Sequence, residues 1–364
     1  MKTSKLENDI TSILNYNCSS EKVALPKKIM FELTNACDLH CNYCSTHLAK
    51  RKKSFMDFGF FKHVLDEAIT LGVKECALFT SGESLLHPDI MKFIEYSSKF
   101  DLYNYISTGG KCLTQPLMDQ LITSGLKSIK FSIDAGTEKT YEKIKGKNNS
   151  LQKLYQNIKY LFEERNKRCS GLKLYGGFAV DRDNEEEIDA FMAQFYPVLD
   201  DVFFKFVAFS GMKLFKEIKI DSKLRNQFYN VEKERHHPCP LMWERLIVQV
   251  DGTLTACCPD YENEYVYANL KKDSLEKAWN NEIIQSFRKE MIEAKFDKLK
   301  LCYKCEGVRG NRASLLGNFN NRIKEAYNKE QNHSKIQPNK ENSSILKKYN
   351  QHKHKEKYLF MLHR

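Results

Sequence analysis

The stretch Cys37-Asp38-Leu39-His40-Cys41-Asn42-Tyr43-Cys44 is the part of the sequence that decides the fold. Its three cysteines are four and three residues apart, and they follow a short apolar run at 28–34. A [4Fe–4S] cluster is normally held by four thiolates. Three thiolates on one loop would leave one iron open to bind another molecule, so the stretch predicts an iron–sulfur site with a vacant position.

Short apolar runs alternate with amphipathic stretches on the C-terminal side of this loop. The expected strands are 28–34, 75–80, 102–107, 128–134, 172–180 and 201–209, and the expected helices are 57–71, 88–100, 116–124, 150–167 and 185–195. Such alternation favours right-handed βαβ units around a parallel sheet. Six units are too few for a closed eight-stranded barrel. The sequence therefore predicts an α/β fold with a partial (β/α)6 TIM-like barrel at residues 27–215.

Polar residues stand at the end of each of the next three expected strands. Gly82 and Glu83 follow the second strand, Thr108 follows the third, and Ser132 and Asp134 close the fourth. Each alone is compatible with an ordinary turn, a solvated charge or a helix cap. Because the carboxyl ends of parallel strands meet at one edge of a sheet, we expect these residues to converge with the cysteine loop on a single site.

These motifs resemble those of the radical S-adenosylmethionine (radical SAM) superfamily, and the resemblance runs from residue 28 to about residue 210. In that family a CX3CX2C loop holds a [4Fe–4S] cluster whose open iron binds the methionine part of S-adenosylmethionine. The resemblance implies that Cys37, Cys41 and Cys44 bind this cluster. The contacts that it implies for S-adenosylmethionine are Tyr43 near the adenine, Gly82 and Glu83 at the amino group, and Thr108, Ser132 and Asp134 at the ribose and methionine.

A second set of cysteines follows the barrel. Cys239 precedes an expected hairpin with strands at 246–250 and 253–256, Cys257 and Cys258 follow it, and a CX2C pair, Cys302 and Cys305, comes after an expected helix at 274–292. From spacing alone this set suits either a four-cysteine zinc site or an iron–sulfur cluster.

The run CX12GX4C followed by CX2C resembles the SPASM or shortened "twitch" region that follows radical SAM barrels, here at residues 230–312. The resemblance implies one auxiliary [4Fe–4S] cluster on Cys239, Cys257, Cys302 and Cys305, with gaps like those of the radical SAM dehydrogenase acting on 2-deoxy-scyllo-inosamine. Cys258 remains open as a ligand in place of Cys257, a buried filler or a hydrogen-atom donor.

Composition and charge favour a soluble globular protein of a reducing cytoplasm. Much of the formal charge of +11 lies in residues 321–364, where 11 basic residues face 4 acidic ones. No apolar stretch approaches the roughly 18–20 residues of a membrane span. We therefore expect no membrane partner and no nucleic-acid partner. Residues 1–26 are expected to be an N-terminal extension, and residues 320–364 a basic, disordered tail.

These features predict a radical SAM oxidoreductase with S-adenosylmethionine and two [4Fe–4S] clusters, one open and one auxiliary. The expected substrate is a sugar, an aminocyclitol or a nucleotide-linked sugar, undergoing dehydrogenation or epimerisation, with flavodoxin or ferredoxin as electron donor. The alternatives are a peptide-modifying SPASM maturase, which the short segment before the first strand disfavours, and a non-catalytic cluster-binding protein. The candidates for a catalytic base, none of them specific, are Arg182, Lys205, His236 and His237.

Overall fold

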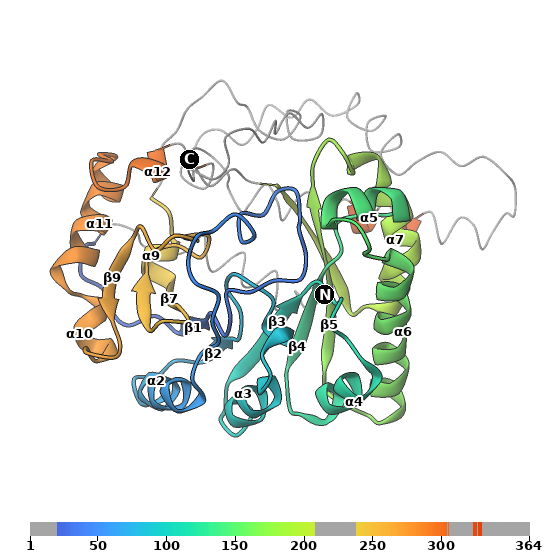
Figure 1. The fold of residues 1–364 in the computed structure, drawn as a ribbon, viewed down its shortest axis with the longest axis horizontal. Coiled ribbons are helices and arrows are strands. Elements are labelled where there is room, and N and C mark those ends of the chain that lie inside the picture. The colour runs from blue at the N-terminus through green and yellow to red at the C-terminus, as the bar shows by residue number, and fades with distance from the viewer. Residues whose placement is uncertain (1–19, 208–237, 304, 306–322, 326, 330–364) are drawn as a thin grey trace, which may run out of the picture.

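The computed structural model describes residues 20–207, 238–303, 305, 323–325 and 327–329 (Figure 1). These residues form one nine-stranded sheet in the order β6-β5-β4-β3-β2-β1-β7-β8-β9. Its strands are β1 (Lys28–Phe31), β2 (Glu75–Ala77), β3 (Tyr103–Thr108), β4 (Ser128–Ser132), β5 (Lys173–Val180), β6 (Asp201–Phe206), β7 (Arg245–Val248), β8 (Thr253–Thr255) and β9 (Val266–Asn269). Strands β1 to β6 pair in parallel, which confirms the partial barrel.

Helices cover the outer face of the parallel strands (Figure 1). In the barrel these are α2 (Phe58–Thr70), α3 (Ile90–Ser97), α4 (Gln115–Thr123), α5 (Glu138–Lys145), α6 (Leu151–Lys167) and α7 (Ile188–Phe195), with single turns at Ser84–Leu86, Glu185–Glu187 and Tyr196–Val198. Phe31 of β1 packs edge-on against Phe61 of α2, with ring centroids 4.7 Å apart. Phe178 of β5 packs edge-on against Phe191 of α7, with ring centroids 4.9 Å apart. Each fully buried ring contributes about 1.5–3 kcal/mol to the core.

Local signals explain most of the helix boundaries. The side chain of Asp57 accepts a hydrogen bond from the backbone N–H of Phe60 at 2.8 Å and so caps α2 as expected. The helix α5 was not expected, because its sequence is mostly charged and only Tyr141 and Ile144 supply buried apolar side chains. The side chain of Thr137 caps it at the start.

The region after the barrel contains α9 (Leu241–Glu244), α10 (Leu275–Trp279), α11 (Glu282–Glu293) and α12 (Lys300–Tyr303). We call residues 238–303 and 305 the auxiliary region. The expected helix 274–292 is divided into α10 and α11, because the side chain of Asn281 accepts from the N–H groups of Ile283 and Ile284 at 3.0 Å and starts a new helix.

The expected hairpin forms, with Val248 of β7 opposite Leu254 of β8. In addition, β7 pairs in parallel with β1, from Lys28 beside Arg245 to Phe31 beside Val248. The auxiliary region thus continues the sheet of the barrel. The sequence did not predict this pairing, because local sequence patterns do not report which distant strands pair.

Two buried tryptophans of the auxiliary region form hydrogen bonds with the segment that precedes β1. The indole N–H of Trp243 donates to the carbonyl of Ser20 at 2.7 Å, and that of Trp279 donates to the carbonyl of Ala24 at 2.9 Å. The guanidinium of Arg288 stacks on the Trp279 ring at 4.3 Å. The end of the expected N-terminal extension is therefore part of the folded body.

Of the expected tail at 320–364, the structure describes residues 323–325 and 327–329 only. Residues 323–325 and 327–329 are helical, Tyr327 is buried against Tyr196, and Lys324 forms an ion pair with Asp201 at 2.6 Å. Apolar side chains within this basic segment give it a surface to pack. Within the described residues, no helix combines the length and the apolar character needed to cross a membrane.

Candidate active site

The cysteine loop follows β1 and is hydrogen-bonded to the C-terminal end of α5. The backbone N–H of His40 donates to the carbonyl of Lys145 at 3.1 Å, and that of Asn42 donates to the carbonyl of Ile144 at 2.9 Å. The N–H of Cys44 donates to the carbonyl of Cys41 at 3.0 Å and closes a tight turn. These backbone bonds fix the loop without using any cysteine side chain.

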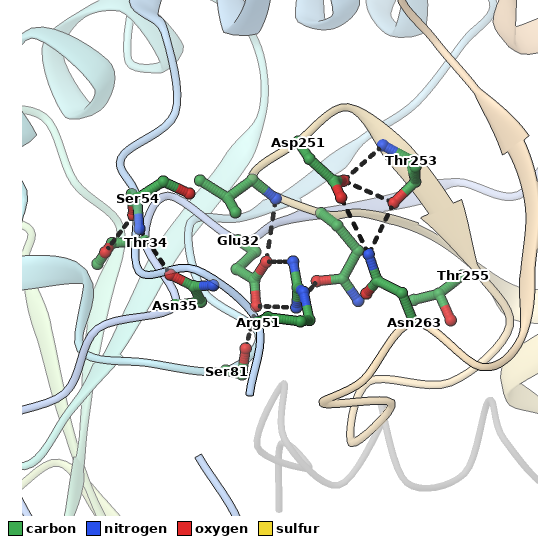
Figure 2. Close-up of polar contacts among 12 residues, drawn as sticks. Glu32, Thr34, Asn35, Arg51, Ser54, Ser81, Asp251, Thr253, Thr255 and Asn263 are labelled. Carbon is green, nitrogen blue, oxygen red and sulfur yellow. Dashed lines mark hydrogen bonds and ion pairs between the residues drawn. The ribbon is translucent and has the colours of Figure 1, made fainter. Parts of the chain in front are cut away.

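Glu32, the residue after β1, joins this loop to two neighbouring segments (Figure 2). Its buried carboxylate accepts from the guanidinium of Arg51 at 2.7 and 3.1 Å, from the N–H of Val250 at 3.0 Å and from the hydroxyl of Ser81. Arg51 lies in the segment that follows the cysteine loop, Val250 in the turn after β7, and Ser81 in the segment after β2. One carboxylate therefore holds three segments around the base of the site.

The thiols of Cys37, Cys41 and Cys44 are close enough for their charges to interact. Burial raises the pKa of Cys37 to about 12 and the pKa of Cys41 to about 11, and the Lys145 ammonium partly counteracts the rise at Cys41. Metal binding deprotonates such thiols outright. Three partly buried cysteines, with a cation beside Cys41, therefore fit the thiolate ligands of an iron–sulfur cluster.

In the described residues, no three His, Cys, Asp or Glu side chains are gathered closely enough to hold a single metal ion. A cubane cluster does not need such a group, because each cysteine binds a different iron.

Gly82 and Glu83 lie against the start of the cysteine loop. A Cβ atom on Gly82 would stand 2.2 Å from the carbonyl oxygen of Thr34, and its φ of +74° belongs to the left-handed region. The N–H of Glu83 donates to the carbonyl of Ala36 at 2.8 Å. Glycine is therefore required where the two segments cross.

The carboxylate of Glu83 is held in one orientation. It accepts from the N–H of Leu85 at 3.1 Å, from the hydroxyl of Thr108 at 2.9 Å and from the N–H of Gly109 at 2.8 Å. Burial raises the pKa of Glu83 to about 7, although these three bonds oppose the rise. A carboxylate has about four acceptor positions, so one remains for a further donor. The structure brings Thr108 and Glu83 together as expected from the sequence.

Asp134 is the centre of a second polar group at the same edge of the sheet. Its carboxylate accepts from Lys145 at 2.5 Å, from the N–H of Ala179 at 2.5 Å and from the hydroxyl of Tyr43. Burial favours a higher pKa for Asp134, but the Lys145 charge outweighs it and the pKa is lowered. Ser132 ends β4 on the inner face. Tyr43, expected near an adenine, here joins the loop to Asp134.

The second cysteine set also comes together. The charges of Cys239, Cys258, Cys305 and Cys302 all act on the thiol of Cys257. Burial raises the pKa of Cys239 to about 12 and the pKa of Cys257 well above its usual value. The sulfur of Cys258 lies 3.6 Å from the sulfur of Met30 on β1, and its charge also acts on Cys239 and Cys257. Cys258 therefore lies beside the set, while Cys257 is the one of the two on which the other three auxiliary cysteines all act.

Tyr261 lies between the two cysteine sets. Its hydroxyl is 3.8 Å from the sulfur of Cys44. Burial raises the pKa of Tyr261 well above its usual value, and the charges of Cys44 and Cys257 add to the rise. Sequence reasoning missed this tyrosine, since it follows Cys257 and Cys258 in a turn without any recognisable spacing.

The candidates for a catalytic base are not gathered into one place. Arg182 is half exposed and lies 3.9 Å from Asp183, and Lys205 is exposed on β6. His236 and His237 lie outside the described residues. Lys130, on β4, was missed, although the alternation of that strand would have placed it on the inner face with Ser132.

Two family models match the chain. The model of the radical SAM superfamily matches residues 31–195, and that of SPASM, an iron–sulfur cluster-binding domain, matches residues 239–306. These matches confirm the resemblance that the cysteine spacings indicated. They imply S-adenosylmethionine and two iron–sulfur clusters, one for each domain, as the cofactors.

Curated relatives are similar over the barrel. The PqqA peptide cyclase of Gluconobacter oxydans (strain 621H) is 30% identical over 169 residues, which are 46% of this chain and 45% of that protein. The PqqA peptide cyclase of Xanthomonas euvesicatoria pv. vesicatoria (strain 85-10) is 28% identical over 169 residues, or 46% of this chain and 44% of that protein. The match therefore spans about half the length of these relatives.

Solved structures share the fold over a larger part of the chain. SuiB of Streptococcus suis, bound to S-adenosylmethionine, has a TM-score of 0.60 at 14% identity, covering 78% of this chain and 72% of that one. BtrN, in complex with AdoMet and 2-DOIA, has a TM-score of 0.53 at 18% identity, covering 78% and 93%. At these identities the likeness shows the fold alone.

The expected sugar, aminocyclitol or nucleotide-sugar dehydrogenase or epimerase is wrong, because the curated relatives are peptide cyclases. The expectation rested on the spacing of the auxiliary cysteines, which reports how a cluster is held and carries no information about the substrate. The expectation of a small-molecule partner fails for the same reason. What the two family models do establish is that the chain contains a radical SAM domain and, C-terminal to it, a SPASM iron–sulfur domain.

Proposed function

We propose that this chain is a radical SAM enzyme that modifies a peptide. The observation that carries the proposal is the 30% identity of its barrel to a PqqA peptide cyclase. The fold shared with SuiB, which was solved bound to the precursor peptide SuiA, agrees with it. Because the match spans only part of the curated relatives, the bond that is formed in the peptide is left open.

In this proposal Cys37, Cys41 and Cys44 hold the open [4Fe–4S] cluster. Their burial, their mutual proximity and the nearby Lys145 charge support it. A second [4Fe–4S] cluster is held by the four auxiliary cysteines, Cys239, Cys257, Cys302 and Cys305, whose charges interact in the same way. A set of four thiolates saturates a cluster, so the auxiliary cluster would carry electrons rather than bind the peptide.

The polar residues at the strand ends would hold S-adenosylmethionine. The free acceptor position of Glu83 would take a donor from the amino group, next to Gly82 and Thr108. Lys145, Tyr43 and Asp134 form a fixed polar wall on the other side of the loop, near Ser132. When bound, the reduced cluster and S-adenosylmethionine together supply a radical that abstracts hydrogen from an unactivated C–H bond. The contribution of the chain is to hold the target C–H close to that radical and exclude water.

Reduction of the open cluster requires a single-electron donor. A flavodoxin or ferredoxin is proposed for this role, and a reducing cytoplasm is the compartment that fits twelve cysteines in the chain.

Anaerobic reconstitution followed by peptide turnover tests the function. The full chain, loaded with iron and sulfide and supplied with S-adenosylmethionine and dithionite, is incubated with short peptides encoded beside its gene. We expect 5′-deoxyadenosine and a changed peptide mass. The Cys37→Ala/Cys41→Ala/Cys44→Ala variant should form neither. Cleavage of S-adenosylmethionine that responds to sugars or aminocyclitols and to none of the peptides would overturn the proposal.

A further inference from the structure

Lys130 is a cation on the inner face of the barrel. Ile129 and Phe131, its neighbours on β4, are fully buried on the side of the helices. Because successive side chains of a strand point to opposite faces, Lys130 faces inward together with Ser132. The pairing of β4 places Ser107 of β3 and Tyr175 of β5 beside it.

The side chain of Lys130 reaches across the inner face. Its ammonium nitrogen lies 4.8 Å from the centre of the Phe203 ring on β6 and 5.8 Å from the centre of the Phe79 ring, which follows β2. Neither β2 nor β6 is a direct neighbour of β4 in the sheet. Contacts with both are possible only from the inside of the curved sheet. The ammonium therefore stands between two aromatic rings within the barrel.

No acid in the described part of the chain neutralises this cation at ion-pair distance. The carboxylate of Asp134 acts on its charge, but Asp134 already forms an ion pair with Lys145. Burial and the charge of Lys205 lower the pKa of Lys130 to about 7. A half-buried ammonium between rings, on which the charges of Lys205, Lys28 and Lys145 also act, is costly unless an anion joins it.

We propose that Lys130 binds a carboxylate that the substrate peptide carries into the barrel, so that the modified position lies close to an aspartate or glutamate. The inference rests on the proposed peptide substrate. The aromatic rings of Phe79 and Phe203 would hold the methylene groups of the acidic side chain, and the ammonium would hold its oxygens. Lys205, which is exposed on β6 and whose charge acts on Lys130, would attract an acidic segment.

Selection from a random peptide library tests the inference. The iron–sulfur-loaded full chain, immobilised under nitrogen with S-adenosylmethionine bound, is presented with mRNA-displayed random dodecapeptides. A charge-assisted contact predicts that Asp and Glu are enriched at one position by roughly tenfold or more. The enrichment should disappear in Lys130→Met and persist in Lys130→Arg. Lys127→Met, which removes an exposed lysine just before β4, is the matched control and should select as the wild type does.

S-adenosylmethionine also has a carboxylate, so its affinity is measured for the same proteins. We expect equal dissociation constants for wild type and Lys130→Met, which also shows that the variant is folded and loaded. A tenfold loss of affinity for S-adenosylmethionine in Lys130→Met would assign the ammonium to the cofactor and overturn the inference. Acid enrichment that survives in Lys130→Met, or none in the wild type, would overturn it as well.

These outcomes are separable from failure of the proposed function. Peptides that are selected and change in mass without any preference for acids would leave the function intact and overturn the role of Lys130. Selected acidic peptides that bind but never change in mass under reductant would overturn the function and leave the carboxylate site standing.

Discussion

The hydroxyl of Tyr261 lies 3.8 Å from the sulfur of Cys44, although the two residues are 217 positions apart in the chain. Tyr261 belongs to the auxiliary region and Cys44 to the loop proposed to hold the open cluster. A single phenol from one domain thus contacts a proposed cluster ligand of the other.

Replacing Tyr261 by phenylalanine removes this contact and keeps the ring. Hydrogen bonds to the sulfurs of a cluster are among the factors that set its reduction potential, and a donor to a thiolate favours the reduced state. We expect Tyr261→Phe to make the potential of the open cluster more negative, as measured by redox titration followed by electron paramagnetic resonance. Tyr267→Phe is the control, because the Tyr267 hydroxyl is buried and has no hydrogen-bond partner among the described residues. An unchanged potential in Tyr261→Phe would contradict the contact.

A methyl group at Gly82 should displace the cysteine loop. The added Cβ would lie 2.2 Å from the carbonyl oxygen of Thr34 and 2.8 Å from that of Ala36, both backbone atoms. After reconstitution of Gly82→Ala we expect about four irons per chain in place of about eight, because the open cluster is not retained. Gly171→Ala is the control, since no atom of the part of the chain that the structure describes lies within 4 Å of its Cβ position. Full iron content in Gly82→Ala would show that the loop can shift without losing its cluster.

Removing the charge of Glu32 should destabilise the protein strongly. Its carboxylate is fully buried and its main partner, Arg51, is 12% exposed. Breaking a buried ion pair by changing one partner costs about 3–5 kcal/mol. We expect Glu32→Gln to lower the free energy of unfolding by about 3 kcal/mol in urea titrations at equal iron content. Glu163→Gln, at a pair with side chains 51% and 61% exposed, should change it by less than about 1 kcal/mol. Equal effects would mean that the Glu32 bonds add nothing beyond a surface pair.

The two adjacent cysteines after β8 should behave differently. Cys257→Ala should reduce the iron content by about four per chain and remove the auxiliary cluster signal, whereas Cys258→Ala should keep about eight irons. The reason is that Cys239, Cys302 and Cys305 all act on the Cys257 thiol, whereas the Cys258 sulfur lies against that of Met30, although its charge also reaches Cys239 and Cys257. The reverse pattern of iron loss would exchange their roles.

The parts of the fold that local patterns encode were predictable. The alternation of strands and helices gave the parallel sheet, and the cap at Asp57 marked the start of α2. The superfamily could be recognised from seven cysteines, because their spacing reflects the geometry of the clusters. The convergence of Glu83 with Thr108 followed from the common edge of parallel strands.

Relationships between distant segments were not predictable in the same way. The sequence around Glu32 contains no pattern that predicts its hydrogen bonds with Arg51 and Val250. Tyr261 likewise belongs to no motif that predicts its contact with Cys44. The substrate was misjudged for a related reason. Cysteine spacing records how a cluster is held, while the side chains that meet the substrate, such as Lys130, are scattered over separate strands.

The pairing of β7 with β1 makes the two domains inseparable. If the chain were divided after the barrel, β1 would become a bare edge with unsatisfied backbone groups, a template for association with other chains. The auxiliary region thus covers the edge of the strand that leads into the cysteine loop. Such a region cannot be exchanged like a module, and a domain transplanted from a relative would have to bring a strand in register with Lys28–Phe31.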